Sequence, residues 1–375
     1  MSPESLRPTA YPPSSTYRVQ LNGDFPFRDA KQIVPYLRAL NVGALYTSPF
    51  LTATPGSTHG YDVTDYTTIN PEIGTDADLQ HLAGSLVAHG LGFLVDVVPN
   101  HMGIAGGANA WWQDLLENGR TSSYAGYFDI DWRPLKEELR GKILLPVLGD
   151  PYGVVLERGE LHLALAEGAF TVHYHQTPLP IAPPTYPLIL APALERLGDM
   201  DEEDPARLEL ASIITAAQRL PGPTATDPEE LAERRREQIV IKRRLADLLT
   251  ATPEVAAAIE AAITAINGDP AQPHSYDALD TLLDAQTYRL SSFRTAGEEI
   301  NYRRFFAINE LAAVRQEERE VFAAAHARLL ALLAQAAITG LRIDHPDGLW
   351  DPAGYYRDLQ RAAYCTLMKT PDDVE

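Results

Sequence analysis

The stretch Gly340–Leu349, GLRIDHPDGL, holds the residues whose types and order point most directly to chemistry. Leu341 and Ile343 are apolar at alternate positions, which predicts a short buried strand. Arg342 and Asp344 alternate with them and meet the surface at the end of that strand. A carboxylate there, beside an arginine that keeps it ionised, suits a nucleophile toward the anomeric carbon of a sugar. The alternative is an Arg–Asp ion pair that only closes the strand.

The second stretch is Asp96–His101, DVVPNH, at the end of an apolar run. Asn100 and His101 follow the predicted strand end, where they could hydrogen-bond sugar hydroxyls. Asp96 is still inside the strand and could orient both side chains. A proline turn with a capping asparagine is the alternative interpretation.

The third stretch is Ser57–Asp65, STHGYDVTD, which follows another predicted strand. Gly60 permits a close approach of the backbone. Tyr61 could stack on the face of a sugar ring, and Asp62 could bridge to neighbouring groups. An ordinary turn with a packed tyrosine remains open.

The fourth stretch is Asn301–Arg315, NYRRFFAINELAAVR. Its paired arginines and phenylalanines could line a sugar cleft, but core phenylalanines and solvated arginines are the favoured interpretation. The chain has no phosphate-binding loop of the Walker type and no GxGxxG after a strand. No Cys/His cluster has zinc spacing, so no cofactor or metal site is expected. His59, His101 and His345 are scattered and suit hydroxyl partners better than metal ligands.

These stretches must be positioned by strands and helices that alternate along the chain. A fully apolar strand followed by a helix is typical of parallel pairing in an α/β fold. The final predicted strand begins at Gly340, and its helix covers Asp351–Tyr364. The count is four strand-plus-helix units, half of a (β/α)8 TIM barrel, with a long insertion between the third and fourth strands. The earlier strands are predicted at Thr16–Leu21, Gly43–Thr47 and Gly92–Val97, and the earlier helices at Asp24–Leu40 and Asp76–His89.

The insertion is expected to begin with Trp- and Tyr-rich loops and short strands, and to continue as helices. Asp227 and Thr252, each followed by proline and an acidic residue, predict helix N-caps. Glu310–Ala337 is Ala/Leu-rich and predicts one long helix. The short strands are predicted at Ile143–Val147, Val154–Glu157, Leu161–Ala164 and Phe170–Tyr174. The predicted division is a disordered segment at 1–15, a half-barrel at 16–101 and 336–375, a loop-and-strand insertion at 102–191 and a helical subdomain at 192–335.

Composition excludes several classes of partner. The 375 residues are 45% apolar, which is ordinary for a globular protein, and the net charge is −20. That charge argues against nucleic acid or an anionic membrane as a partner. Cys365 is the only cysteine, so no internal disulfide can form. No signal peptide and no membrane span is predicted, and a cytoplasmic location is expected.

DVVPNH and GLRIDHPDGL resemble the first two signature regions of the α-amylase superfamily, glycoside hydrolase family 13. Further stretches resemble, in order, the maltooligosyltrehalose synthases within it. The FDIDW and EINYRRFF parts are the most specific to that group. The stretches are STYRVQL, TSPF, GSTHGYDVTDY, ENGRTSSYAGYFDIDW, ILLPVLGDPYG, YRLSSFRTAGEEINYRRFF and GLRIDHPDGL.

The resemblance implies a role for each matching residue. Asp344 corresponds to the nucleophile and Arg342 to the arginine that holds it. Asn100 and His101 correspond to residues around the sugar at the cleavage site, with Asp96 in support. The remaining matches are Tyr61, the stacking tyrosine, with Asp62 beside it, and His345, which faces the sugar on the leaving side.

The implied reaction is an intramolecular transglucosylation that converts the reducing-end α-1,4 linkage of a maltooligosaccharide to α,α-1,1, as in trehalose biosynthesis. The sequence departs from the group at Ala307, where aspartate is usual, and at Phe293, where tryptophan is usual. The group's general-acid glutamate lies on the fifth strand, which these residues do not include. We therefore expect essentially no synthase turnover from these residues alone. The open alternatives are an α-glucan hydrolase, a non-catalytic glycan-binding or vestigial half-barrel, and an N-terminal portion completed by a second polypeptide.

Overall fold

The structure is a computed structural model that describes residues 13–272 and 274–368. Residues 1–12 of the segment expected to be disordered lie outside this range. The chain divides into two compact units, which are described separately. Unit 1 comprises residues 1–110, 126–129 and 304–375, and unit 2 comprises residues 111–125 and 130–303.

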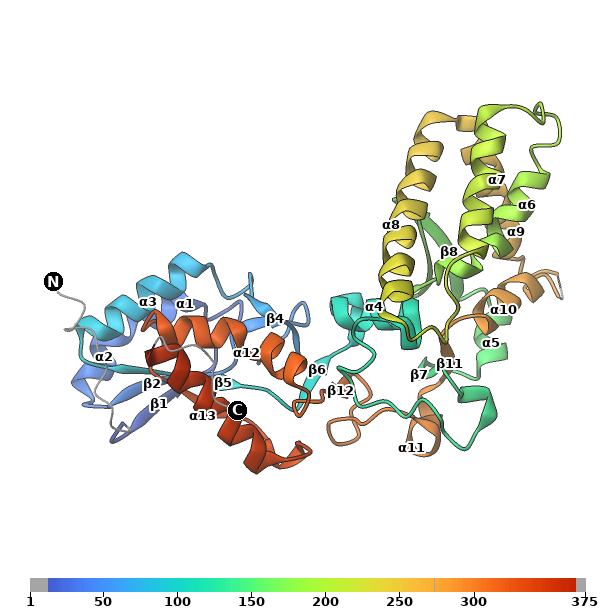
Figure 1. The fold of residues 1–375 in the computed structure, drawn as a ribbon. Helices are drawn as coiled ribbons and strands as arrows, with labels where there is room; N and C mark the ends of the chain where they lie inside the picture. The colour runs from blue at the N-terminus through green and yellow to red at the C-terminus, as the bar shows by residue number, and fades with distance from the viewer. Residues whose placement is uncertain (1–12, 273, 369–375) are drawn as a thin grey trace. The chain divides into compact units, whose positions relative to one another are not determined.

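A parallel sheet of four strands is the centre of unit 1, and its strand order is β1-β2-β5-β13 (Figure 1). The two inner strands are buried because both carry runs of apolar residues. Leu45 and Phe93, which are paired across these strands, are at most 1% exposed. β1 and β13 form the two edges of the sheet. The strands are β1 (Thr16–Val19), β2 (Ala44–Thr47), β5 (Gly92–Val97) and β13 (Gly340–Ile343).

One or two helices follow each strand of this sheet. The predicted helix Asp24–Leu40 is two helices, because Pro35 lacks the N–H that would continue the first one. The third helix begins with a capping box between Thr75 and Asp78. The helices are α1 (Phe27–Gln32), α2 (Val34–Ala39), α3 (Asp76–Ala88), α12 (Arg319–Ala334) and α13 (Pro352–Met368).

Two small antiparallel pairs also belong to unit 1. β3 (Leu51–Ala53) pairs with β4 (Val63–Ile69), and β6 (His101–Gly103) pairs with β12 (Leu311–Ala313). The second pair corrects the prediction of one helix over Glu310–Ala337. Long-range pairing with β6 holds the first part of that segment extended, and the helix begins only at Arg319.

The strands of unit 2 form one three-stranded antiparallel sheet and one parallel pair. The predicted strand Val154–Glu157 is wrong, since these residues lie in helix α5 (Tyr152–Glu157). Its β-branched valines favour a strand, but helical hydrogen bonds to the carbonyl of Pro151 fix the segment as a helix. The strands are β8 (Leu161–Ala166), β9 (Ala169–Tyr174) and β10 (Thr177–Pro180), together with β7 (Ile143–Leu148) and β11 (Tyr288–Ser292).

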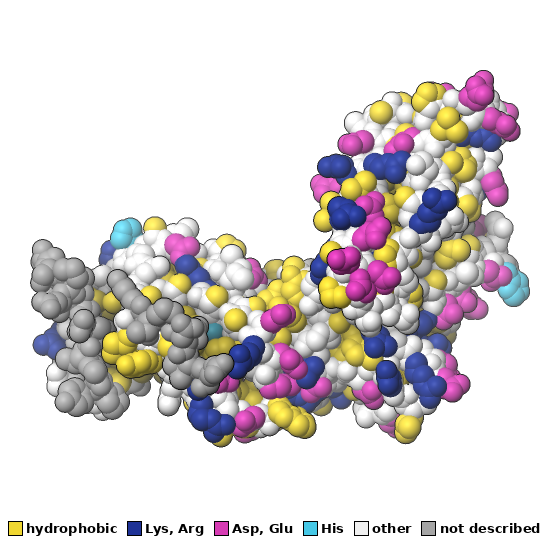
Figure 2. Space-filling view, viewed as in Figure 1, with side chains coloured by type: hydrophobic (Ala, Val, Ile, Leu, Met, Phe, Trp, Pro, Cys, Tyr) yellow, Lys and Arg dark blue, Asp and Glu magenta, His cyan; other side chains and the backbone are white. Residues whose placement is uncertain are grey.

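Helices make up most of the rest of unit 2. Asp227 caps α8 by accepting from the N–H groups of Glu229 and Glu230, whereas Thr252 caps α9 without a side-chain hydrogen bond. Figure 2 shows acidic and basic side chains interspersed over α7 and α8. The helices are α4 (Ala110–Asn118), α5 (Tyr152–Glu157), α6 (Pro187–Glu195), α7 (Pro205–Gln218), α8 (Pro228–Ala251), α9 (Pro253–Ile266), α10 (Asp277–Asp284) and α11 (Ala296–Glu299).

The two units differ from the division expected from the sequence. Residues 304–335, which include α12, belong with the parallel sheet instead of with the helical insertion. The expected helical segment 192–335 also contains β11 and β12. In the described residues no single helix meets the length and hydropathy needed to cross a membrane; α8 and α9 do so only jointly, with a bend of 114° between them.

Candidate active site

Asp344 and Arg342 lie at the carboxyl end of the edge strand β13. The backbone N–H of Asp344 donates to the carbonyl of Val97 at 2.8 Å, which fixes the end of β13 against the end of β5. Nη1 of Arg342 donates to Oδ1 of Asp344. The side chain of Asp344 is 10% exposed and that of Arg342 is 48% exposed. The carboxylate is therefore shielded, while its arginine partner is open to solvent.

Asp96, on β5, is the register partner of Arg342, and its side chain is fully buried. It accepts from Nη1 of Arg342 at 2.9 and 3.2 Å. Its Oδ2 also accepts from the hydroxyls of Tyr46 and Tyr61, each at 2.6 Å. A buried carboxylate is stable only when it is paired and hydrogen-bonded in this way. Arg342 thus bridges two carboxylates, Asp96 and Asp344.

Burial and hydrogen bonds in this cluster shift the pKa values of Arg342, Tyr46 and Tyr61. Burial lowers the pKa of Arg342, but hydrogen bonds to Asp96 and Asp344 outweigh it and raise the pKa overall. Burial, followed by the hydrogen bond to Asp96, raises the pKa of Tyr46 and of Tyr61. At neutral pH the arginine is therefore charged and both tyrosines are hydrogen-bond donors.

Two members of the cluster, Tyr46 and Arg18, were missed by the sequence reasoning. Arg18 on β1 is the register partner of Tyr46 on β2, and its Nη2 donates to the hydroxyl of Tyr61 at 3.1 Å. That hydrogen bond is the main cause of the raised pKa of Arg18. Their positions in the sequence could have indicated a role in the site. Like Asp96, Arg18 and Tyr46 are polar residues inside strands of a parallel sheet.

Asn100 and His101 are buried just beyond β5. Nε2 of His101 donates to the carbonyl of Tyr61 at 3.1 Å, and Nδ2 of Asn100 donates to Nδ1 of His101 at 3.4 Å. These contacts are those of a neutral imidazole with its proton on Nε2. The ring of His101 stacks on Phe305 with centroids 4.1 Å apart.

Asp62 lies in the turn between β3 and β4. Its Oδ1 accepts from the hydroxyl of Ser57 and lies 3.7 Å from Nδ1 of His59. Gly60 has a φ of +77°, and a Cβ there would lie 2.5 Å from the carbonyl oxygen of Pro49. Glycine is therefore required for this turn, which carries Tyr61 toward Asp96.

His345 directly follows Asp344 and has a left-handed backbone, with a φ of +44°. Its ring meets Phe305 and Phe306 edge-on, at centroid distances of 5.0 and 5.8 Å. Phe306 is 75% exposed, so the favoured interpretation of this phenylalanine as a core residue is wrong. The pair of phenylalanines instead joins His101 to His345, because Phe305 contacts both rings.

The structure therefore brings most of the predicted site residues together. Tyr61, Asp96, Arg342 and Asp344 form one hydrogen-bonded cluster, which we call the Asp96 cluster together with Tyr46 and Arg18. His101 joins it through the carbonyl of Tyr61, and Asn100 joins through His101. His345 is linked through Phe305. The contacts described for Asp62 stay within its own turn. Chemically, the cluster presents a shielded carboxylate, Asp344, whose charge is balanced by an arginine.

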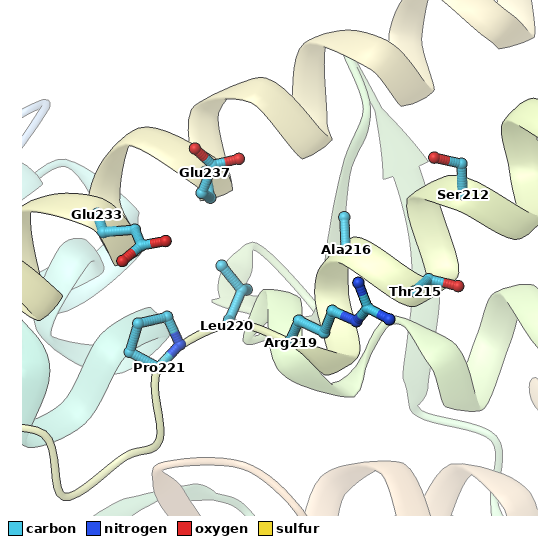
Figure 3. Close-up of a pocket in the computed structure, with 8 residues that line it drawn as sticks. All are labelled: Ser212, Thr215, Ala216, Arg219, Leu220, Pro221, Glu233 and Glu237. Atoms are coloured by element: carbon cyan, nitrogen blue, oxygen red, sulfur yellow. The ribbon is translucent and has the colours of Figure 1, made fainter.

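Unit 2 contains a cavity formed by its own residues. A cavity of about 480 Å³ lies between α7 and α8 of unit 2, where Arg219 faces a space that Glu233 and Glu237 also line (Figure 3). Over residues 13–272 and 274–368, no group of three or more His, Cys, Asp and Glu side chains could hold a metal ion.

Comparison with known proteins gives a consistent result. The catalytic domain of α-amylase, as a family model, matches residues 29–148. A putative maltooligosyl trehalose synthase of Mycobacterium tuberculosis is 34% identical over 357 residues, which are 94% of this chain and 33% of the relative. The solved maltooligosyltrehalose synthase of Arthrobacter ramosus is 31% identical with a TM-score of 0.62, over 94% of this chain and 34% of its own. A hypothetical maltooligosyl trehalose synthase of Sulfolobus tokodaii is 28% identical with a TM-score of 0.59, with 94% and 34% covered.

With the parallel sheet and its terminal carboxylate, these matches indicate the class: the chain is similar to the α-amylase superfamily. Within that superfamily it is similar to the maltooligosyltrehalose synthases over nearly all its length. It spans about a third of the length of the curated relatives it matches.

Proposed function

We propose that the Asp96 cluster is the nucleophile side of an active site for α-1,4-glucans. Asp344 attacks the anomeric carbon, and Arg342 orients the attacking carboxylate through its hydrogen bond and balances its charge. The single observation that carries this proposal is the hydrogen-bonded chain from Asp344 through Arg342 to the fully buried Asp96. If Arg342 and Asp344 formed only a structural ion pair at the end of β13, Arg342 would not need to bind a second carboxylate, the buried Asp96.

Substrate contacts follow from the groups around Asp344. Tyr61 offers a ring for stacking, and its hydroxyl is held by Asp96 and Arg18, so its position is fixed before a sugar arrives. Asn100 supplies hydrogen bonds to sugar hydroxyls, and His101, whose two ring nitrogens are already hydrogen-bonded, holds Asn100 and Tyr61 in place around the sugar. His345, which is partly exposed beside Phe306, faces the sugar on the leaving side.

We infer that the reaction is the synthase reaction, and the support is similarity to the synthases over 94% of the chain. Asp344 forms a bond to C1 of the penultimate glucose while the bond to the O4 of the terminal glucose breaks. That oxygen takes a proton from a general acid. The released glucose turns, and its anomeric hydroxyl attacks the same C1. A proton returns to the general base, and Asp344 leaves.

The proton donor is not assigned within these residues. A retaining site needs a second carboxylate about 5–5.5 Å from the nucleophile. We propose that the parallel sheet is the first half of a (β/α)8 barrel and that a fifth strand carries the acid. That strand belongs to the rest of a longer chain or to a second polypeptide. In the described part of the chain the outer edges of β1 and β13 are open, which is consistent with such completion.

The test is incubation with maltopentaose, with reducing ends and free glucose measured together. Loss of reducing ends without glucose release supports the synthase reaction. Release of glucose or shorter maltooligosaccharides supports a plain hydrolase and contradicts our inference about the reaction. Binding without turnover is what we expect of residues that lack the acid. Absence of maltopentaose binding would overturn the proposed site itself.

A further inference from the structure

A second cavity of unit 2 has a lining rich in basic side chains. Its volume is about 660 Å³, within the range of small-molecule sites. The lining contains no aspartate or glutamate, although the net charge of the whole chain is −20. The lining includes the side chains of Arg120, Trp132, Arg133, Arg140, Lys142 and Thr224.

Two of the four cations in this lining are already paired. Arg140 contacts Glu137 at 3.1 Å, and Lys142 contacts Asp284 at 3.5 Å. The guanidinium groups of Arg120 and Arg133 have no hydrogen bond or ion pair with any described part of the chain. Two guanidinium groups without a carboxylate partner therefore line one cavity, where one anion could accept hydrogen bonds from both.

The backbone beside Trp132 is held on both sides. The carbonyl of Trp132 accepts from the N–H of Gly141 at 3.0 Å. Nδ2 of Asn301 donates to the carbonyls of Asp131 at 2.9 Å and Lys142 at 2.8 Å. The segments that carry Trp132, Arg133 and Lys142 are thus tied to one buried asparagine, and this wall of the cavity is rigid.

The segment that carries Arg120 is also closely packed. Gly119, the residue before Arg120, has a φ of +56°, and a Cβ there would lie 2.9 Å from Cγ2 of Thr287. Only glycine fits the turn in this contact. The turn fixes the backbone of Arg120, and the side chain of Arg120 lines the same cavity.

We propose that this cavity binds a phosphomonoester whose ring stacks on Trp132, with Arg120 and Arg133 holding the phosphate. Guanidinium groups match the geometry of phosphate oxygens and form charge-assisted hydrogen bonds to them. A tryptophan indole offers a flat face to a sugar or a purine ring. The ring can come from a sugar phosphate or from a nucleotide, and the shared chemistry is the phosphate on a ring.

The cavity between α7 and α8 provides a matched control within the same unit. Arg219 is exposed there and lacks an ion pair in the described chain, as Arg120 and Arg133 do, but Glu233 and Glu237 line the same space (Figure 3). The carboxylates repel an anion, so Arg219 should not contribute to phosphate binding.

The test is isothermal titration of the full chain with glucose 1-phosphate and, separately, with adenosine monophosphate; glucose and inorganic phosphate serve as comparison ligands. At least one ester should bind more tightly than glucose and inorganic phosphate, and its affinity should fall as sodium chloride is raised. Arg120→Gln and Arg133→Gln should each weaken that ester roughly tenfold or more, whereas Arg219→Gln should not. Trp132→Ala should weaken the ester but leave inorganic phosphate unchanged.

Circular dichroism of each variant separates loss of the site from loss of the fold, and both arginines are exposed enough for the fold to survive. Tighter binding of glucose 1-phosphate assigns the site to sugar phosphates, and tighter binding of adenosine monophosphate assigns it to nucleotides. If neither ester binds, or if Arg219→Gln weakens binding as much as the other two substitutions, the proposal is overturned. The maltopentaose affinity should be unchanged in all these variants, so this test is independent of the proposed active site.

Discussion

At the scale of single residues, Asp96 is the side chain on which the candidate site most depends. It is fully buried and receives hydrogen bonds from Arg342, Tyr46 and Tyr61. Asp96→Asn keeps the shape but removes the charge that balances Arg342. Because Arg342 is half exposed, we expect a loss of about 1–3 kcal/mol in the free energy of unfolding, below the usual cost of breaking a fully buried pair.

Urea unfolding at a fixed protein concentration measures this loss. Asp347→Asn is the matched control, since its carboxylate is 84% exposed and should change stability by less than about 0.5 kcal/mol. Equal effects of the two substitutions would contradict a special role for Asp96.

Asn100 is the residue from which we expect a direct contribution to glucan binding. Asn100→Ala should weaken maltopentaose binding by about 1–3 kcal/mol through loss of hydrogen bonds to the sugar. Titration calorimetry checks this, with Gln335→Ala, an exposed position at the end of α12, as the control. An unchanged affinity in the Asn100 variant would remove this residue from the proposed sugar contacts.

The sequence identified Asp344, Arg342 and Asp96 because each ends or interrupts an apolar strand with charge. It did not identify Tyr46 or Arg18, whose roles depend on which strands are neighbours and in what register. The exposure of Phe306 was also mispredicted, because composition alone cannot distinguish a core phenylalanine from one that packs edge-on against a histidine.

At the scale of elements, the contact of α12 with α13 contains a buried histidine. Nδ1 of His326 donates to the carbonyl of Phe322 at 2.8 Å, and Nε2 accepts from the hydroxyl of Tyr355 at 2.8 Å. A neutral ring satisfies both contacts, whereas a protonated ring would lose the second. Burial lowers the pKa of His326 from 6.5 to about 4.

This depressed pKa predicts a pH dependence of stability. Between pH 6.5 and pH 4 the unfolded chain binds a proton at His326 and the folded chain does not, so stability falls as the pH falls. The contribution is on the order of 2 kcal/mol between pH 7 and pH 5. His326→Gln should lose that part of the pH dependence in urea unfolding, whereas His81→Gln, at an exposed histidine, should keep it. Identical pH profiles for His326→Gln and the unchanged chain would refute this.

Most elements with strong local patterns could be predicted, and those set by distant partners could not. The strand Gly92–Val97 was predicted with its full bounds, and the helix that begins at Asp76 ends within one residue of its prediction. The segment Leu311–Ala313 is a strand because β6, two hundred residues earlier, pairs with it. No local signal in an Ala/Leu-rich sequence reports such a partner.

At the scale of the whole molecule, the parallel sheet has two open edges. β1 and β13 each pair with one strand only in the described chain. Open edges offer unpaired backbone groups to other chains, so we expect the isolated chain to associate as its concentration rises. Light scattering coupled to size exclusion measures this. Thr16→Pro removes an N–H at the edge of β1 and should reduce association. A clean monomer with a sharp two-state melt would contradict the prediction.

The central claim is that Asp344 is a nucleophile already held in position within these residues. The most direct test uses a 5-fluoro-α-glycosyl fluoride of maltose, because fluoride leaves without a proton donor and the 5-fluoro group slows hydrolysis of the adduct. The proposal predicts one covalent sugar per chain, located by peptide mass spectrometry at Asp344, and no adduct in Asp344→Asn, which should still bind maltopentaose. A chain that binds maltopentaose but gains no adduct, or gains it at another carboxylate such as Asp347, would contradict the claim.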